Sequence, residues 1–282
     1  MNDNYVSTTL SRDNALFLKD DFLFEKKTFI STMTEAHYHG HYEIYYLLSG
    51  SQNYFINGKY YSVNKGDVVL VPKWVMHKTA SGYGGYRFLI NFNDNFLSKY
   101  YSKTASNALL NVFSQPIVRP AEEKAGEVLN LFNAIGNDAK DVNNPSLFLN
   151  FTALLLLLKN CKSIKEENVS RELQTLGYIT DFLDKNFANV NSLQDVSNAL
   201  YVSKYHVCHL FARHLGTTFS GYLTKLRLKN ATEMLISSTN TVSFVAESCG
   251  FNTTTYFCNV FKKEYGCSPL KYKNAFSKNQ TK

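Results

Sequence analysis

Three histidines on alternate positions and a nearby glutamate are the residues of this sequence best suited to chemistry. His37, His39 and His41 stand in the stretch AHYHGHYE, and Glu43 follows two residues after the last of them. Imidazole nitrogens and carboxylate oxygens bind transition metals, and they also form hydrogen bonds with the hydroxyl groups of small molecules. The stretch therefore predicts either a metal centre, as in an enzyme, or a polar pocket that recognises a ligand.

The elements that must position these histidines are short runs of aromatic and β-branched residues between about Phe22 and Phe92. Turn signals such as Ser49-Gly50 and Asn57-Gly58 separate the runs at intervals typical of an antiparallel sandwich or barrel. Asn57-Gly58, between YFI and KYY, predicts a two-residue hairpin. We therefore expect an antiparallel β barrel over residues 22–118.

After Pro120 the apolar spacing becomes helical and predicts two helices over about 121–161. The most apolar run, LFLNFTALLLLLKN, is interrupted by Asn150 and Thr152 and is too short to span a bilayer. It predicts a buried helix, so we expect no membrane association. The charged stretch 162–172 lacks apolar periodicity and predicts a linker between two domains.

Charge and cysteine content narrow the class of protein. The chain of 282 residues carries a net charge of +7; residues 1–169 have 17 Lys and Arg against 16 Asp and Glu, whereas residues 170–282 have 13 against 7. This basic excess indicates a polyanionic partner for the last part of the chain. Five cysteines without a C-x-x-C pair and a polar N-terminus without an apolar export segment predict reduced thiols and a cytoplasmic location.

The last part of the chain repeats itself. A shift of fifty residues superposes Val196 on Ala246, Tyr201 on Phe251, Ser203 on Thr253, Cys208 on Cys258, Leu210 on Val260, Phe211 on Phe261 and Gly216 on Gly266. Each copy predicts two helices joined by a three- or four-residue break, which is a helix-turn-helix whose second helix can enter a major groove. A plain helical bundle with polar outer faces is the alternative. The repeat, the short turns and the local charge together favour DNA binding.

Between the two copies, residues 219–237 form a continuous helical pattern of 19 residues. A helix of this length spans about 28 Å. With the widths of the two units added, such a helix would set the second helices about 34 Å apart, which is one turn of DNA. One domain would then reach two successive major grooves.

The stretches FARHLGTTFSGYLTKLRLKNATEML and VAESCGFNTTTYFCNVFKKEYGCSPLKY resemble the DNA-binding domain of the AraC/XylS transcriptional regulators. The resemblance covers about the last 110 residues, and Lys273 departs from it where the family commonly has Arg. It implies base contacts on the outward face of each second helix, at Tyr205, Cys208, His209, Thr254, Thr255 and Asn259. Phosphate contacts are expected from Ser203, Lys204, Thr253, Lys262 and Lys263, with Ser203 and Thr253 also explicable as helix caps.

The histidine stretch resembles the first cupin motif, met by His37, His39, Glu43 and Gly50, and Gly66, Pro72 and His77 meet the second. Trp74 stands where the second motif has glycine, and His41 is extra and is expected to point away from the others or toward solvent. Sensor domains of the regulator family are known for binding sugars and other small molecules. The expected effector-binding residues are His37, His39, Glu43, Trp74 and His77. No cofactor is expected, although His37, His39, Glu43 and His77 are candidates for a divalent metal.

These patterns predict a two-domain α+β protein. A cupin-like domain over 1–161, with two helices after its barrel, precedes an all-α domain over 173–282 in which a long helix joins two helix-turn-helix units. The resemblance implies a ligand-responsive regulator, not an enzyme, that activates transcription and has promoter DNA, a small effector such as a sugar and RNA polymerase as partners. The stretch LFLNFTALLLLL is expected either to form a homodimer seam or to pack against its own barrel. The alternatives are a metal-dependent enzyme fused to a DNA-binding module and a regulator that binds no small molecule.

Overall fold

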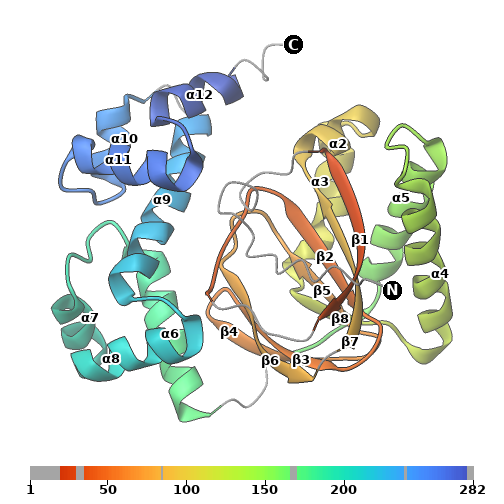
Figure 1. The fold of residues 1–282 in the computed structure, drawn as a ribbon, viewed down its shortest axis with the longest axis horizontal. Coiled ribbons are helices and arrows are strands. Elements are labelled where there is room, and N and C mark those ends of the chain that lie inside the picture. The colour runs from red at the N-terminus through yellow and green to blue at the C-terminus, as the bar shows by residue number, and fades with distance from the viewer. Residues whose placement is uncertain (1–19, 30–34, 84, 166–169, 238–239, 278–282) are drawn as a thin grey trace, which may run out of the picture. The chain divides into compact units, whose positions relative to one another are not determined.

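The computed structural model describes residues 20–29, 35–83, 85–165, 170–237 and 240–277. They divide into two compact units. One unit holds the described residues up to 177 together with 213–216, and the other holds 178–212 and the described residues from 217 onward. The first contains antiparallel sheets with helices and the second is helical, which confirms the predicted α+β class (Figure 1).

The first unit contains two antiparallel sheets. The larger has the strand order β1 (Phe22–Phe29), β7 (Gly85–Phe92), β2 (Tyr42–Leu47), β5 (Val68–Val71), β8 (Ile117–Arg119) and β9 (Lys162–Ser163). The smaller has the order β4 (Lys59–Asn64), β3 (Ser51–Ile56) and β6 (His77–Tyr83). The predicted hairpin joins β3 to β4, and Asn57 and Gly58 both have positive φ, at 46° and 82°, as a two-residue turn of this kind requires.

The two faces of the larger sheet contribute side chains to two different hydrophobic cores, as strand β2 shows. Ile44 and Tyr46 belong to the core under the helices, whereas Tyr45 and Leu47 pack with Tyr54 of the smaller sheet. This alternation follows from the two-residue period of a strand. Glu43 has the same parity as Tyr45, so its side chain lies on the inner face, between the two sheets.

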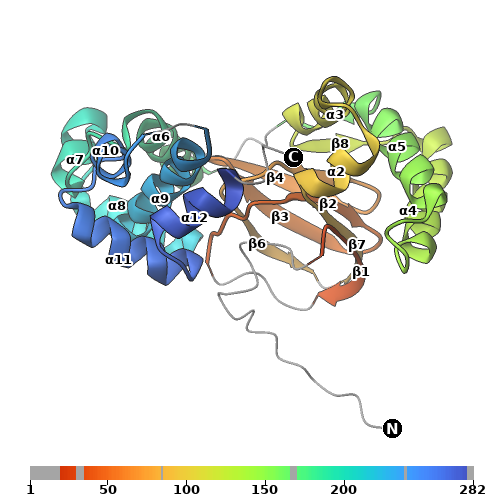
Figure 2. The ribbon, with the colours of Figure 1, turned by 90° about the horizontal axis from the view of Figure 1, so that it is seen from above.

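Helices cover the outer face of the larger sheet. They are α2 (Asp94–Tyr100), α3 (Lys103–Leu110), the 3-10 turn η1 (Asn111–Ser114), α4 (Glu122–Asp138) and α5 (Pro145–Lys159), and Figure 2 shows α4 and α5 side by side beyond the strands. The predicted pair corresponds to α4 and α5. The apolar run of α5 packs partly on its own unit, since Leu147, Phe151, Leu154, Leu155 and Leu158 are buried.

The stretch predicted as a linker contains regular structure at both ends. Lys162 and Ser163 form β9, which pairs with β8, and α6 already begins at Arg171. The helices that follow are α6 (Arg171–Asn186), α7 (Leu193–Leu200), α8 (Lys204–Leu210) with a π turn over Phe211–Leu215, α9 (Phe219–Ser237), α10 (Val242–Ser248), α11 (Thr254–Tyr265) and α12 (Pro269–Ser277). The long helix predicted over 219–237 is α9. No helix within the described residues is both long and apolar enough to cross a membrane.

Arg227 fixes α9 in the helical unit. Its Nε donates to the carbonyl of Phe187 at 3.0 Å and its Nη2 to the carbonyl of Val190 at 2.7 Å. Its guanidinium also lies 5.9 Å from the ring centre of Phe251. The planar fork of arginine suits two carbonyls at once, which ties α9 to the connection between α6 and α7.

Candidate functional site

Backbone pairing brings the two cupin-like motifs together in the first unit. His37 and His77 form an antiparallel bridge in which each backbone N–H donates to the other's carbonyl, at 3.0 and 2.9 Å. The bridge sets their rings 4.3 Å apart between centres, and the His39 ring lies 4.7 Å from that of His77. The three side chains therefore converge although His37 and His77 are 40 residues apart in the sequence.

Hydrogen bonds to backbone carbonyls orient two of these rings. His39 Nδ1 lies 3.0 Å from the carbonyl of His41, and His77 Nδ1 lies 2.8 Å from that of Val75. Because a carbonyl only accepts, each Nδ1 carries the proton, and in the neutral ring Nε2 then has a free lone pair. Both Nε2 atoms are buried and have no hydrogen-bond partner.

Glu43 supplies a buried carboxylate next to these nitrogens. It is 7% exposed, and its Oε2 lies 3.6 Å from Nε2 of His39. Burial alone would raise the pKa of Glu43, but the interaction with His39 and the neighbouring His77 and His37 outweigh it and hold the pKa below its usual range. Burial lowers the pKa of His77 to about 4, with His39 adding to the effect. At neutral pH the site thus presents an uncharged His77 and a carboxylate.

The expectation that His41 points away from the group or toward solvent is wrong. His41 is 5% exposed, and its ring stacks on that of His39 with centres 3.7 Å apart and planes 4° from parallel. Burial, with a contribution from His39, lowers its pKa to about 2. His41 has the same parity as His39 and Glu43, so its place beside His39 agrees with the alternation of side chains along an extended chain.

Trp74 joins the site through its backbone. Its N–H donates to the carbonyl of His39 at 2.7 Å, and its φ of 62° is the left-handed conformation that the motif normally gives to glycine. Its indole ring has its centre 6.1 Å from that of Tyr38, which alternates with His37 and His39 along the chain.

Three further polar residues on the inner faces were missed. Gln52 is 2% exposed and accepts a hydrogen bond from the Tyr45 hydroxyl at 2.6 Å, and the Arg87 guanidinium lies 5.1 Å from the Tyr45 ring centre. Asn91 is 7% exposed and stands opposite Glu43 in the pairing of β2 and β7. The signal was present in YRFLINF, where Arg87 and Asn91 interrupt the apolar pattern at inward positions.

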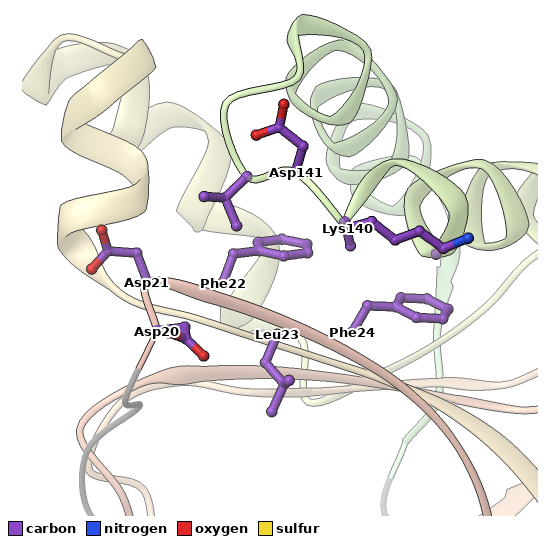
Figure 3. A pocket seen from close by; sticks show the side chains of 10 residues that line it. Asp20, Asp21, Phe22, Leu23, Phe24, Lys140 and Asp141 are labelled. Carbon is purple, nitrogen blue, oxygen red and sulfur yellow. The ribbon is translucent and has the colours of Figure 1, made fainter.

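A surface pocket of about 630 Å³ lies elsewhere in this unit, between the start of β1 and the end of α4 (Figure 3). Another of about 810 Å³ lies between the start of α4 and the end of α5. Neither is lined by any of the predicted effector-binding residues. The first is lined by Asp20, Asp21, Phe22, Leu23, Phe24, Gly136, Ala139, Lys140, Asp141 and Val142.

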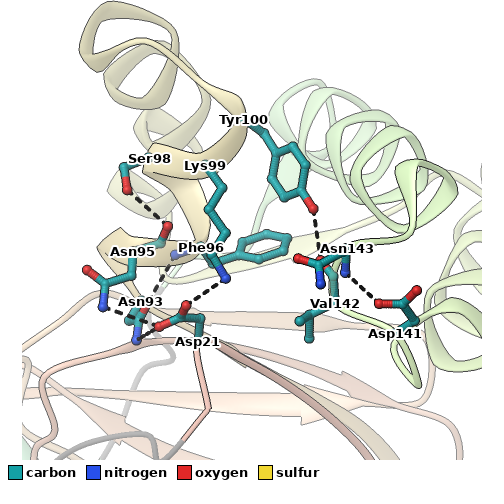
Figure 4. Close-up of polar contacts among 10 residues, drawn as sticks. All are labelled: Asp21, Asn93, Asn95, Phe96, Ser98, Lys99, Tyr100, Asp141, Val142 and Asn143. Carbon is teal, nitrogen blue, oxygen red and sulfur yellow. Dashed lines mark hydrogen bonds and ion pairs between the residues drawn. The ribbon is translucent and has the colours of Figure 1, made fainter.

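The best-connected carboxylate of the first pocket has a structural role (Figure 4). Asp21 pairs with Lys99 at 2.8 Å and accepts hydrogen bonds from the side chains of Asn93 and Asn95, both at 3.2 Å. Burial raises its pKa, but these partners outweigh burial and lower it. The network anchors the start of β1 to α2.

In the helical unit, α8 and α11 are the second helices of the two repeats. Val207, Leu210 and Phe211 are buried along one side of the first, and Phe257 and Phe261 along the second. Among the outward residues predicted to touch bases, Thr254 is half-buried. The others are exposed, and they are Tyr205, Cys208, His209, Thr255 and Asn259. The residues predicted to touch phosphates are all exposed and are Ser203, Lys204, Thr253, Lys262 and Lys263.

Ser203 and Thr253 are also the N-caps of these two helices. The Ser203 hydroxyl accepts from the N–H of His206 at 3.2 Å, and that of Thr253 from Tyr256 at 3.1 Å. Such caps satisfy N–H groups that a helix leaves unpaired at its start. The two hydroxyls therefore set where α8 and α11 begin.

The fifty-residue register holds only for the second helix of each repeat. The N-caps Ser203 and Thr253 are 50 residues apart, but the N-caps of the first helices, Ser192 and Thr241, are 49 apart. The superposition of Val196 on Ala246 is therefore wrong by one residue. The turn of the first repeat is one residue shorter.

Tyr201 shows the consequence of the shorter turn. It has a φ of 55° and is 95% exposed, whereas Phe251 is 6% exposed. In the second repeat the left-handed residue is Gly250, with a φ of 80°. Superposing Tyr201 on Phe251 was thus wrong, because Tyr201 has the backbone role of Gly250.

Two models of known protein families match separate parts of the chain. Residues 26–143 match the model of the AraC-like ligand binding domain, and residues 196–275 match that of a helix-turn-helix domain. The uncharacterized HTH-type transcriptional regulator YijO of Escherichia coli K12 is 30% identical over 43% of this chain and 44% of its own length. The regulatory protein PocR of Salmonella typhimurium is 30% identical over 35% and 32%. This chain thus spans less than half of these two relatives.

Two similarities extend over most of the chain. The HTH-type transcriptional activator RhaR of Mannheimia succiniciproducens is 24% identical over 86% of this chain and 88% of its own. The crystal structure of ToxT from Vibrio cholerae is 15% identical over 90% of this chain and 97% of its own, with a TM-score of 0.37.

Proposed function

Because the chain belongs to the AraC family of transcriptional regulators, we propose that its helical unit binds promoter DNA and that its β unit binds a small effector that controls this binding. The relatives are regulators, so no catalytic role is assigned to the histidines. The observation that carries the proposal is the pair of helix-turn-helix units, each with a buried apolar side and an exposed polar side on its second helix.

The DNA-binding mechanism uses both second helices. Helix α8 and helix α11 enter successive major grooves, and α9, whose 19 residues span about 28 Å, separates them. Exposed Lys204, Lys262 and Lys263 contact phosphates. His209 and Asn259 supply the most selective base contacts, because an imidazole N–H donates to guanine and an amide pairs with adenine.

Hydroxyl-radical footprinting of a bound promoter fragment tests this mechanism. For each bound chain, the proposal predicts two protected segments about 10 base pairs apart on one face of the duplex. A variant with Asn259 replaced by alanine should lose protection in only one segment. A single protected segment for the intact protein would contradict the use of both units.

The effector proposal rests on the buried polar group of the β unit. Glu43 and the Nε2 atom of His77 can accept hydrogen bonds, which suits the hydroxyl groups of a sugar. Binding would favour one placement of the two DNA-binding units of a dimer over another and so change operator choice. Activation would then follow from contact with RNA polymerase.

Exposed apolar residues on α5 support a homodimer. Leu149 is 63% exposed and Leu156 50%, and Ala153 lies exposed between them on the same face. Large apolar residues grouped on one helix face are typical of a protein interface. We therefore propose that α5 pairs with its copy while its opposite face stays packed on the barrel.

A thermal-shift screen of sugars, together with metal analysis of the same sample, tests the effector part. Stabilisation by one sugar, abolished by Glu43→Gln, supports a sugar sensor. If no small molecule changes the unfolding temperature while DNA binding persists, the protein is a regulator without a small-molecule effector.

A further inference from the structure

We propose that Tyr201, in the turn that joins α7 to α8 (Figure 1), donates a hydrogen bond from its hydroxyl to a phosphate of the bound DNA. This inference rests on the proposed DNA binding of the helical unit. It adds a contact that the outward positions of the two second helices do not include, and only the first helix-turn-helix unit makes it.

Tyr201 has a backbone conformation that destabilises the fold. Its φ of 55° and ψ of 38° lie in the left-handed region, where a Cβ comes too close to the following carbonyl oxygen. Packing of the ring does not offset this strain, because the side chain is 95% exposed. Folding of the unit therefore does not account for a tyrosine at this position. A strained residue that folding does not explain points to a function.

The second repeat shows what the same turn needs for folding alone. Gly250 has the equivalent left-handed conformation, with a φ of 80°. A Cβ at Gly250 would lie 2.4 Å from the backbone carbonyl oxygen of Ala188, so a side chain does not fit there. The first turn instead carries a whole tyrosine that extends into solvent. Only the first unit can therefore present a side chain to DNA from this turn.

The residues that follow Tyr201 indicate which part of the DNA it meets. Ser203 and Lys204, at the start of α8, are exposed and are expected to contact phosphates. The base-reading positions come later, at Tyr205 and His209, whose rings lie nearly parallel with centres 6.3 Å apart. Tyr201 precedes all of these residues. A helix that enters the major groove with this outward face leaves Tyr201 at the edge of the groove, where the phosphates lie.

The chemistry of a tyrosine hydroxyl suits this contact. Ionised phosphate oxygens accept hydrogen bonds, and tyrosine hydroxyls are among the donors that contact them in protein–DNA complexes. The side chain has only two rotatable bonds, so it loses little conformational entropy when it is fixed. Because the hydroxyl is uncharged near pH 7, it releases no counterion from the DNA, unlike a lysine. The contact therefore adds affinity without adding to the salt dependence of binding.

Binding of the full-length protein to a duplex that carries the sequence enriched from a random DNA pool tests the proposal. Tyr201→Phe removes only the hydroxyl and should raise the Kd about tenfold, the usual effect of one hydrogen bond to a charged group. The slope of log Kd against log salt concentration should stay the same, whereas Lys204→Ala should reduce that slope by about one. Tyr178→Phe is the matched control. It removes the same hydroxyl from a tyrosine of α6 that is 69% exposed, and it should leave the Kd unchanged.

Neutral methylphosphonates, placed in the duplex one at a time, locate the phosphate. The half-site of α8 is the one that Asn259→Ala leaves protected. One substitution beside this half-site should weaken binding of the intact protein and should have little further effect on binding of Tyr201→Phe. Such non-additivity is expected of two groups in contact. Fully additive losses at every phosphate would show that the Tyr201 hydroxyl contacts none of them.

Tyr201→Gly separates an effect on binding from an effect on folding. It relieves the backbone strain, so it should resist urea better than the intact protein while binding the duplex no more tightly than Tyr201→Phe does. Weaker binding by a more stable variant does not come from misfolding. If both variants bind like the intact protein, the contact is wrong and the proposed function stands. If the random pool yields no enriched sequence, the contact and the proposed function fail together.

Discussion

Two bulky residues have a left-handed backbone conformation, and each lies beside a region with a proposed function. Trp74 has a φ of 62° beside the histidines, and Tyr201 has a φ of 55° in the turn before α8. For a residue with a Cβ, this conformation costs about 1–2 kcal/mol. Burial of the Tyr201 side chain does not offset this strain, because the side chain is 95% exposed.

Replacing Tyr201 with glycine should therefore stabilise the helical unit. We expect Tyr201→Gly to raise the free energy of unfolding by about 1 kcal/mol, because glycine adopts this conformation without strain. Tyr201→Ala removes the same ring but keeps the Cβ, so it should give no such gain. Urea denaturation measures both, and an equal effect of the two variants would show that backbone strain is not the cause.

Asn259 tests the direct reading of bases. It is exposed on α11, and an amide pairs with adenine through two hydrogen bonds. Asn259→Ala should cost about 1–3 kcal/mol at one operator position and little at the others. Binding to a set of single-base operator variants measures this. An equal loss on every variant would show that Asn259 does not read a base.

The structure brings the predicted pocket residues together where a motif fixes both spacing and geometry, and their binding of an effector stays a prediction. His37, His39, Glu43 and His77 come together because alternate residues share a side of an extended chain and a bridge joins the two motifs. The expectation for His41 was wrong although its spacing, two residues after His39 and two before Glu43, already places it on the same side. Tyr201 failed because a one-residue difference in the turn is hidden in an otherwise regular repeat.

At the scale of elements, caps define where the first helices of the two repeats begin. Helix α7 starts with a capping box in which the Ser192 side chain caps the helix and Asp195 accepts from the backbone of Asn191 at 2.7 Å and of Ser192 at 2.8 Å. These hydrogen bonds lower the pKa of Asp195 below its usual value of 3.8. The carboxylate is therefore stabilised in its ionised, hydrogen-bonded form.

This cap makes a pH-dependent contribution to stability. The pKa of Asp195 is lower in the folded protein than in the unfolded chain. The stabilisation by its carboxylate is therefore present above about pH 4 and is lost as pH falls through the folded pKa. Asp195→Asn should be less stable than the intact protein at pH 7, and the difference should be smaller near pH 3. Denaturation at both values measures this, with exposed Glu247→Gln as the control. A difference of the same size at both pH values would exclude the capping carboxylate as its cause.

Helices and strands with a strong local sequence pattern were predicted, whereas elements without such a pattern were not. The hairpin at Asn57-Gly58 and helix α9 match their sequence patterns closely. Helices α2 and α3 have only seven and eight residues, too few to establish a period. Strand β9 was missed because its two residues, Lys162 and Ser163, gain their conformation from pairing with β8 rather than from their own propensity.

At the scale of the whole molecule, the account requires two copies of the chain. Leu149→Glu combined with Leu156→Glu should raise the dimer dissociation constant by at least about 100-fold, because burial of each leucine contributes about 1.5–3 kcal/mol. Sedimentation velocity measures this. Phe244→Glu, at an exposed apolar position on α10, is the control. A control variant that dissociates equally would place the interface elsewhere.

Selection of bound sequences from a random DNA pool tests the central claim most directly. For each chain of the dimer, the account predicts enrichment of two half-sites about 10 base pairs apart, bound at least about 1,000-fold more tightly than random DNA at physiological salt. Replacing both His209 and Asn259 with alanine should abolish the enrichment. If the intact protein enriches no sequence at any ionic strength, with or without metal and sugars, it is not a sequence-specific regulator.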